Sequence, residues 1–235
     1  MQKNNRISSA VLILLMGTLR LVAQNPGEEE FGIWYMYFGT NRVSEKLSVH
    51  SEGQFRYYEV PDNFNQLLLR TGLNYHIDAN AMATGGYAYI KTDGSFSEPE
   101  GAFDSREHRI FEQFILRNQV WKLLFEHRYR LEQRFLDFGP TRDTQHRARY
   151  RIQVTLPLSD KFFLNFYDEL FVNLQDDLFG QNRLYGAVGL HLNKISSMQF
   201  GYLRNQFANA VFDRWQIGFF FNPDLRDIFK KKEAP

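Results

Sequence analysis

Apolar and polar residues alternate along nearly the whole chain after Glu30. A period of two places successive side chains on opposite faces of a β-strand. Between Trp121 and Phe135, mostly large apolar residues at odd positions alternate with arginines and glutamates at even positions. A helix of 3.6 residues per turn would spread these arginines around its whole circumference, so the pattern predicts strands. Eleven segments show it: 31–38, 46–59, 66–75, 81–91, 106–117, 121–135, 147–156, 162–173, 182–192, 197–206 and 213–221.

The length of these segments indicates where the strands lie. Several are longer than ten residues, whereas strands of soluble proteins average about five or six. Strands that span a membrane need about 9–11 residues. The connections also alternate in length, with short ones at 78–80, 118–120, 158–160 and 194–196 and longer ones at 92–105, 136–144, 174–181 and 207–212.

This arrangement predicts an all-β fold, an antiparallel transmembrane β-barrel over residues 31–221. Short periplasmic turns and longer extracellular loops are typical of outer-membrane barrels. The competing fold is a soluble β-sandwich or a lipocalin-like barrel, in which the polar face would look outward. Strand length and the many charged second faces favour the membrane barrel.

The number of strands is predicted less sharply than the fold. Bacterial single-chain barrels have even strand numbers. If 46–59 is the first strand, ten strands close and segment 31–38 is left over, unless it pairs with a strand that the pattern does not reveal. We therefore expect 10–12 strands, with ten or twelve as the two closed solutions.

The first 23 residues have the pattern of an export signal. Lys3 and Arg6 supply a positive start, residues 7–19 form an apolar run, and Ala23 is a small residue suited to the cleavage site. The run is too short for a membrane anchor. We predict a signal peptide over residues 1–23, a short N-terminal segment over 24–30, a C-terminal tail over 222–235 and an address in the cell outer membrane.

Composition removes several classes of protein. The chain has 235 residues and no cysteine, which excludes a disulfide scaffold and a zinc–thiolate site. No stretch of 18 apolar residues occurs, which excludes a bundle of membrane helices. A formal charge of +1 gives no case for a nucleic-acid partner. The histidines are scattered and no glycine-rich phosphate loop is present, so we predict no metal and no cofactor.

Aromatic residues make up 16% of the chain and concentrate on the apolar faces. Tyrosine and tryptophan gather in girdles at the two membrane–water boundaries of barrel proteins. We expect such positions for Trp34, Tyr35, Tyr37, Trp121, Tyr129, Tyr150 and Trp215.

The chain resembles an uncharacterised outer-membrane barrel family of Gram-negative bacteria, the domain of unknown function 2490. The resemblance rests on short pieces in a common order, which are 31–34 (FGIW), 68–73 (LLRTGL), 86–89 (GYAY), 107–109 (EHR), 129–135 (YRLEQRF), 147–151 (RARYR), 168–173 (DELFVN), 181–183 (QNR) and 201–203 (GYL). They span nearly the whole chain after the signal. The resemblance implies a barrel and an outer-membrane address, and it implies no reaction.

Barrels of this kind end their last strand with an aromatic residue that the barrel-assembly machinery reads. Phe219, Phe220 and Phe221 occupy that place here. The resemblance therefore implies two partners, outer-membrane lipid and the assembly machinery during biogenesis.

The polar faces of the strands, placed in the lumen, carry the chemistry. Arginine strongly outnumbers lysine there, and a guanidinium pairs with carboxylates and phosphates through two parallel hydrogen bonds. We expect an excess of six positive charges, from the basic residues Lys46, Arg56, Arg70, Arg109, Arg128, Arg130, Arg134, Arg147, Arg149, Arg151 and Arg183 and the acidic residues Glu52, Glu107, Glu126, Glu132 and Glu169.

Three functions remain open. In the first, arginine–glutamate ladders fill a narrow barrel and make it rigid. In the second, surplus arginine makes the lumen a narrow channel for small anions such as sugar acids or phosphates. In the third, the protein is an outer-membrane lipid-modifying hydrolase that uses Ser48 and His50 with Glu52 on the same face. No G-x-S-x-G motif supports an enzyme, so we expect none.

Overall fold

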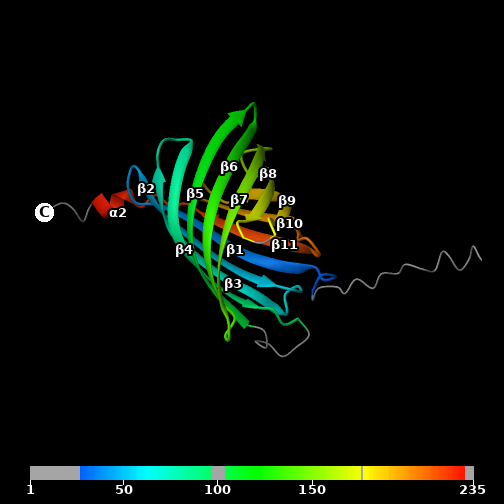
Figure 1. The fold of residues 1–235 in the computed structure, drawn as a ribbon. Helices are drawn as coiled ribbons and strands as arrows, with labels where there is room; N and C mark the ends of the chain where they lie inside the picture. The colour runs from blue at the N-terminus through cyan, green and yellow to red at the C-terminus, as the bar shows by residue number, and fades with distance from the viewer. Residues whose placement is uncertain (1–26, 97–103, 176, 231–235) are drawn as a thin grey trace, which may run out of the picture.

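The computed structural model describes residues 27–96, 104–175 and 177–230, and it is a closed β-barrel (Figure 1). The predicted signal peptide lies outside the described residues. The strands are β1 (Gly32–Arg42), β2 (Leu47–Tyr57), β3 (Phe64–His76), β4 (Ala81–Asp93), β5 (Asp104–Val120), β6 (Leu123–Asp137), β7 (Arg142–Pro157), β8 (Phe162–Asn173), β9 (Phe179–His191), β10 (Ser196–Gln206) and β11 (Val211–Phe221).

Every one of the eleven segments with alternating residues forms a strand, so the predicted all-β barrel is confirmed. The count lies within the predicted range, but the expectation of ten or twelve strands is wrong. Segment 31–38 is not left over, because it forms most of β1 and closes the barrel between β2 and β11.

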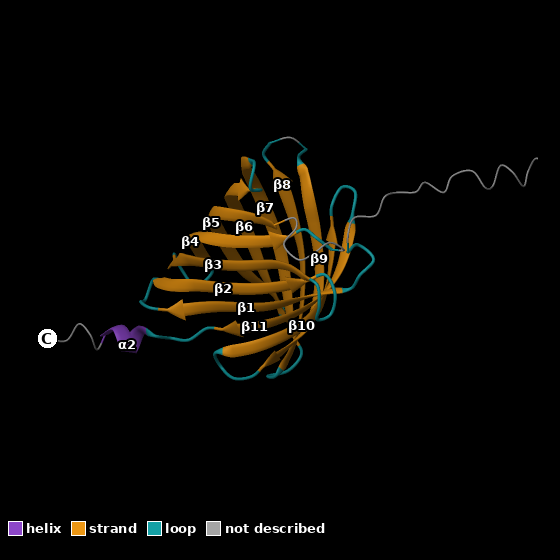
Figure 2. Cartoon of the chain, turned by 90° about the horizontal axis from the view of Figure 1, so that it is seen from below, coloured by secondary structure: helices purple, strands orange, loops and turns teal. Residues whose placement is uncertain are grey.

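The closing pair also departs from a wholly antiparallel barrel. All other neighbours are antiparallel, whereas β1 and β11 run parallel, from Gly32 opposite Arg214 to Gly39 opposite Phe221. Figure 2 shows the two arrows side by side and pointing the same way. With an odd number of strands that reverse direction at each turn, the first and last strands must share a direction.

The two ends of the barrel differ in their connections. One end, the short-turn end, carries the connections 43–46, 77–80, 121–122, 158–161 and 192–195. The other, the loop end, carries 58–63, 94–103, 138–141, 174–178 and 207–210. The predicted difference in length is confirmed in direction but is smaller than expected, because strands such as β6 and β7 continue further into the loops.

Each described end of the chain is attached to a different end of the barrel. At the loop end, the backbone N–H of Val211 donates to Glu28 Oε1 at 2.9 Å, and the Arg214 guanidinium donates to the carbonyl oxygen of Glu30 at 2.7 Å. The short helix α2 (Arg226–Lys230) lies at the short-turn end (Figure 1). The described chain therefore enters the barrel at one end and leaves it at the other.

The segment after β11 follows the end of β1. The N–H of Arg42 donates to the carbonyl of Pro223 at 2.9 Å, and the N–H of Leu225 donates to the carbonyl of Arg42 at 2.8 Å. The Arg226 guanidinium bonds the carboxylates of Asp224 and Glu45, each at 2.6 Å. The hydrogen bond that Arg226 donates to Asp224 lowers the pKa of Asp224 to about 2. Within the described residues, no helix has the length and apolar character needed to cross a membrane.

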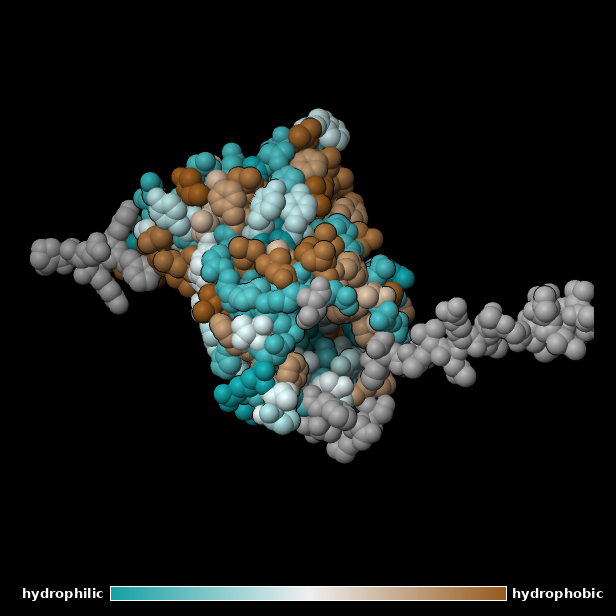
Figure 3. Space-filling model, viewed as in Figure 1, coloured by the Kyte–Doolittle hydropathy of each residue, from teal (hydrophilic) through white to brown (hydrophobic). Residues whose placement is uncertain are grey.

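Strand alternation sorts the side chains into an inner and an outer set. On β2, Glu52, Gln54 and Arg56 are buried inside, whereas Phe55 is half exposed outside. Large apolar side chains cover much of the outer wall in the same way, and Figure 3 shows them in brown among polar ones. Among the most exposed are Leu73, Leu131, Phe166, Val188 and Phe200.

The inner wall holds aromatic side chains that the girdle hypothesis did not foresee. Trp34, predicted at the membrane boundary, points inward and is only 5% exposed, because it lies opposite the inward Arg56 in the β1–β2 register. Inward glycines make room for other rings. A Cβ on Gly86 would lie 2.6 Å from the Phe111 ring, and one on Gly189 would lie 2.1 Å from the Phe163 ring.

Candidate functional site

The barrel encloses a cavity of about 860 Å³. Its lining reaches both ends of the barrel. Thr155 and Asn222 line it near the short-turn end, and Tyr58 and Gln145 line it near the loop end. The cavity therefore follows the barrel interior rather than forming a pocket at one rim.

All ten arginines predicted to face the lumen line this cavity, which are Arg56, Arg70, Arg109, Arg128, Arg130, Arg134, Arg147, Arg149, Arg151 and Arg183. Of the predicted acidic residues, Glu52, Glu126 and Glu169 also line it. Glu107 and Glu132 do not line the cavity, and both are buried against arginines. The cavity surface is therefore richer in guanidinium than the wall as a whole.

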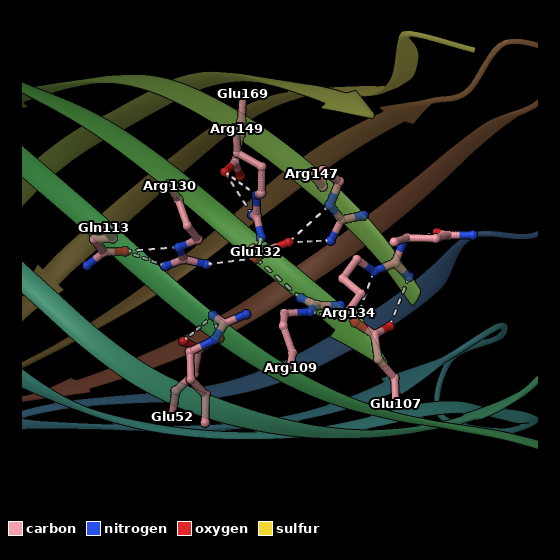
Figure 4. A network of polar contacts seen from close by, with 12 residues as sticks. Glu52, Glu107, Arg109, Gln113, Arg130, Glu132, Arg134, Arg147, Arg149 and Glu169 are labelled. Atoms are coloured by element: carbon pink, nitrogen blue, oxygen red, sulfur yellow. Dashed lines mark hydrogen bonds and ion pairs between the residues drawn. The ribbon is translucent and has the colours of Figure 1, made fainter. Parts of the chain in front are cut away.

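Glu132 on β6 is the centre of the largest polar network (Figure 4). Its carboxylate is 2.6 Å from both Arg147 and Arg149, 3.4 Å from Arg109 and 3.7 Å from Arg130. The residue is 1% exposed. A carboxylate so deeply buried is stable only when guanidiniums compensate its charge, and several of them converge on it here.

The network continues along the wall made by β5 to β8. Glu169 accepts from Arg128 at 2.6 Å and from Arg149 at 2.7 Å. Glu107 accepts from Arg109 at 2.6 Å and from Arg134 at 2.9 Å.

Two further glutamates extend the pairing. Glu126 accepts from Arg151 at 2.7 Å and from Arg117 at 2.9 Å. On the neighbouring strands β2 and β3, Glu52 pairs with Arg70 at 2.7 Å. Every predicted lumen glutamate is thus bound by at least one arginine.

Two inward phenylalanines stack against guanidiniums of the network. The Phe171 ring centroid lies 4.1 Å from Arg149 Cζ, 4.8 Å from Arg183 Cζ and 5.1 Å from Arg147 Cζ. An arginine over an aromatic face gains about 0.5–2 kcal/mol, more where water is excluded. Sequence reasoning missed this contribution, although Phe171 stands between Glu169 and Asn173 on the polar face of its strand.

Phe111 plays the same part on β5. Its ring centroid lies 5.3 Å from Arg70 Cζ and 5.1 Å from Arg130 Cζ. Phe111 is fully buried and stands between Arg109 and Gln113 in the alternating pattern. A large apolar residue within a polar face is the sequence signal for such a support.

The predicted set of lumen cations needs three corrections. Lys46 is not in the lumen, because it belongs to the 43–46 turn and its ammonium lies over the outward ring of Tyr75, 5.9 Å from the centroid. Arg117 on β5 and Arg214 on β11 were missed, and both line the cavity. Arg214 is buried near the loop end, and its segment shows weaker alternation than the central strands.

The residues of the hydrolase hypothesis do not form the expected group. Ser48 Oγ bonds His76 Nε2 at 2.8 Å and accepts from Asn74 Nδ2 at 3.0 Å, while His50 bonds Glu52 at 3.1 Å. Ser48 is 0% exposed. A nucleophile must reach its substrate, and this hydroxyl is enclosed and lacks the predicted His50 partner.

No group of three or more metal-ligating side chains that could hold an ion occurs within residues 27–96, 104–175 and 177–230. The chemistry of the interior is therefore that of guanidinium, carboxylate, amide and aromatic groups. Guanidinium is the most frequent charged group on the cavity lining.

Comparison with known proteins supports the family and no activity. Residues 31–216 match the family described as "Protein of unknown function (DUF2490)", and the chain belongs to this family. The match begins just before β1 and ends within β11, so it covers the barrel. The curated proteins contain no match.

Among solved structures, the chain matches the siderophore receptor PirA from Pseudomonas aeruginosa, with 10% sequence identity and a TM-score of 0.32. The match covers 74% of this chain and 34% of the receptor, so the chain spans about a third of the receptor's length. Similarity at this level is no guide to function.

Proposed function

We propose that this protein is an integral barrel of the outer membrane and that its interior is a narrow passage for small anions. The observation that carries the proposal is the cavity of about 860 Å³, lined from both ends of the barrel by ten predicted arginines. A surplus of fixed positive charge in a confined space attracts anions and repels cations.

The outer surface supports the membrane location. Soluble monomers rarely expose large contiguous apolar areas, whereas the wall of this barrel carries many exposed leucine, phenylalanine and valine side chains. Lipid would cover them. The proposed partners are therefore outer-membrane lipid, small anionic solutes and, during biogenesis, the assembly machinery at the aromatic end of β11.

A purely structural barrel is the second candidate, and the Glu132 network favours it. Side chains that bind one another across neighbouring strands fill space and make the wall rigid. In that case the cavity would hold water and conduct nothing.

Conductance of the refolded barrel in a planar bilayer separates the two. With a salt gradient, we expect a stable current whose reversal potential shows selectivity for anions. Replacing Arg128 and Arg151, which stand opposite each other on β6 and β7, with glutamine should reduce that selectivity. The outward Arg106→Gln is the matched control and should leave it unchanged. A folded barrel without current would overturn the passage and leave the structural role.

A further inference from the structure

Trp34 lies between two arginines from distant parts of the chain. The ring centroid is 3.9 Å from Arg56 Cζ and 5.1 Å from Arg183 Cζ. Arg56 stands opposite Trp34 in the β1–β2 register, whereas Arg183 comes from β9. All three side chains line the cavity.

Neither arginine forms an ion pair with a carboxylate among the described residues. Glu169 stands opposite Arg183 in the β8–β9 register, but its carboxylate pairs with Arg128 and Arg149. Arg56 donates to Gln54 Oε1 at 2.6 and 3.0 Å and to Gln66 Oε1 at 2.6 Å. Arg183 donates to Asn205 Oδ1 at 3.3 Å and, with the Gln181 amide in the orientation that satisfies both of its ends, to Gln181 at 3.0 Å. These amides hold the guanidiniums in place without neutralising them.

The arrangement leaves both guanidiniums without an ion pair of their own. A guanidinium does not give up its proton in a protein, so both groups remain cationic. Placing two cations on one indole is costly unless an anion joins them. Trp34 Nε1 is also buried and has no hydrogen-bond partner, so the same place offers a further unused donor.

We infer that Trp34, Arg56 and Arg183 form a binding subsite for an oxyanion, the carboxylate or phosphate group of a small solute. Guanidiniums bind both groups through paired charge-assisted hydrogen bonds. The inference deepens the proposed function, because it assigns one place within the passage at which the anion is held, and it relies on that passage for access.

The tryptophan itself supplies the probe. In a Trp121→Phe/Trp215→Phe background, Trp34 is the remaining tryptophan of the chain. We expect inorganic phosphate or glucuronate, added to the refolded protein in detergent, to change its emission in a saturable manner. Neutral glucose should change nothing. The anion that binds with the higher affinity identifies phosphate or carboxylate as the preferred group. Calorimetry on the unaltered protein gives the affinity without substitutions.

Substitution of either arginine tests the site directly. Arg183→Gln should weaken binding by about tenfold or more, since a hydrogen bond to a charged group contributes about 1.5–3 kcal/mol. Arg183→Lys, which keeps the charge and loses the planar fork, should fall in between. Arg106→Gln on the outer wall is the matched control and should bind as the background does.

The outcomes separate this inference from the passage. Saturable binding with a silent bilayer would support the subsite and overturn the passage. An anion current without saturable binding, or with binding unaffected by Arg56→Gln and Arg183→Gln, would support the passage and overturn the subsite. Absence of both the current and the saturable binding would overturn the passage and the subsite together.

Discussion

Buried arginines have different partners on two parts of the inner wall. On the wall of β5 to β8, arginines meet glutamates in a continuous network around Glu132. On the wall of β1, β2 and β9, Arg56 and Arg183 contact amides and aromatic rings but form no ion pair among the described residues. In the first arrangement the arginines share carboxylates of the protein itself, whereas under our proposal a bound anion supplies the missing carboxylate or phosphate in the second. The two walls therefore differ in how their buried guanidiniums are compensated, and our proposal assigns rigidity to the first and anion binding to the second.

Removing the centre of the paired wall should have the largest effect. Glu132→Gln leaves Arg109, Arg147 and Arg149 without their shared carboxylate, and breaking a buried ionic group costs about 3–5 kcal/mol. Urea unfolding of the barrel in lipid vesicles, followed by tryptophan fluorescence, measures the loss.

The outward Glu112→Gln is a matched control for this change. Glu112 accepts one exposed hydrogen bond, from Gln133 at 3.1 Å, and its replacement should cost less than about 1 kcal/mol. Equal losses for the two variants would contradict the central position of Glu132.

Arginines of the two walls should respond in opposite ways. Arg149→Gln removes ion pairs to Glu132 and Glu169 and should destabilise the barrel by about 2–3 kcal/mol. Arg183→Gln removes no ion pair, and the stacking lost on Trp34 and Phe171 is offset by the removal of a buried charge, so the free energy of unfolding should stay within about 0.5 kcal/mol or rise. The same urea series, run without phosphate, compares them. A similar loss in both variants would erase the distinction between the walls.

A smaller effect is expected from the aromatic support of the paired wall. Gly86→Ala places a Cβ 2.4 Å from the Thr71 carbonyl oxygen and 2.6 Å from the Phe111 ring on which Arg70 and Arg130 stack. Such crowding should cost about 1–2 kcal/mol. Gly85→Ala is the matched control, because an added Cβ meets nothing within 4 Å. A neutral Gly86→Ala in the same unfolding assay would show that both the Phe111 ring and the Thr71 backbone are free to move.

The sequence predicts the barrel and its inner surface well because both depend on local alternation. Arg147, Arg149 and Arg151 follow one another at intervals of two, and nothing beyond the strand is needed to place them on one face. The ten arginines predicted in the lumen line the cavity for this reason, whereas Arg117 near the end of β5 was missed. The same local rule failed for Trp34, since β1 is apolar on both faces over much of its length.

What the sequence did not predict depends on register between distant strands. The pairing of β1 with β11 joins residues about 180 positions apart, and no local pattern specifies it. The partner of Ser48 is His76 on β3 rather than His50 on its own strand, for the same reason. The lack of an ion pair at Arg183 also required the tertiary structure, because Glu169 stands opposite it in the β8–β9 register but pairs with Arg128 and Arg149 instead.

The parallel seam between β1 and β11 has a consequence for the orientation of the protein in a cell. Gly32 and Phe221 lie at opposite ends of the barrel. In a membrane-spanning barrel, a reporter fused beside β1 and another fused after β11 would therefore sit in different compartments. Protease added to intact cells should cleave the reporter outside the cell and leave the other intact. The two reporters together show which end of the barrel faces outward, and no label in a loop is needed.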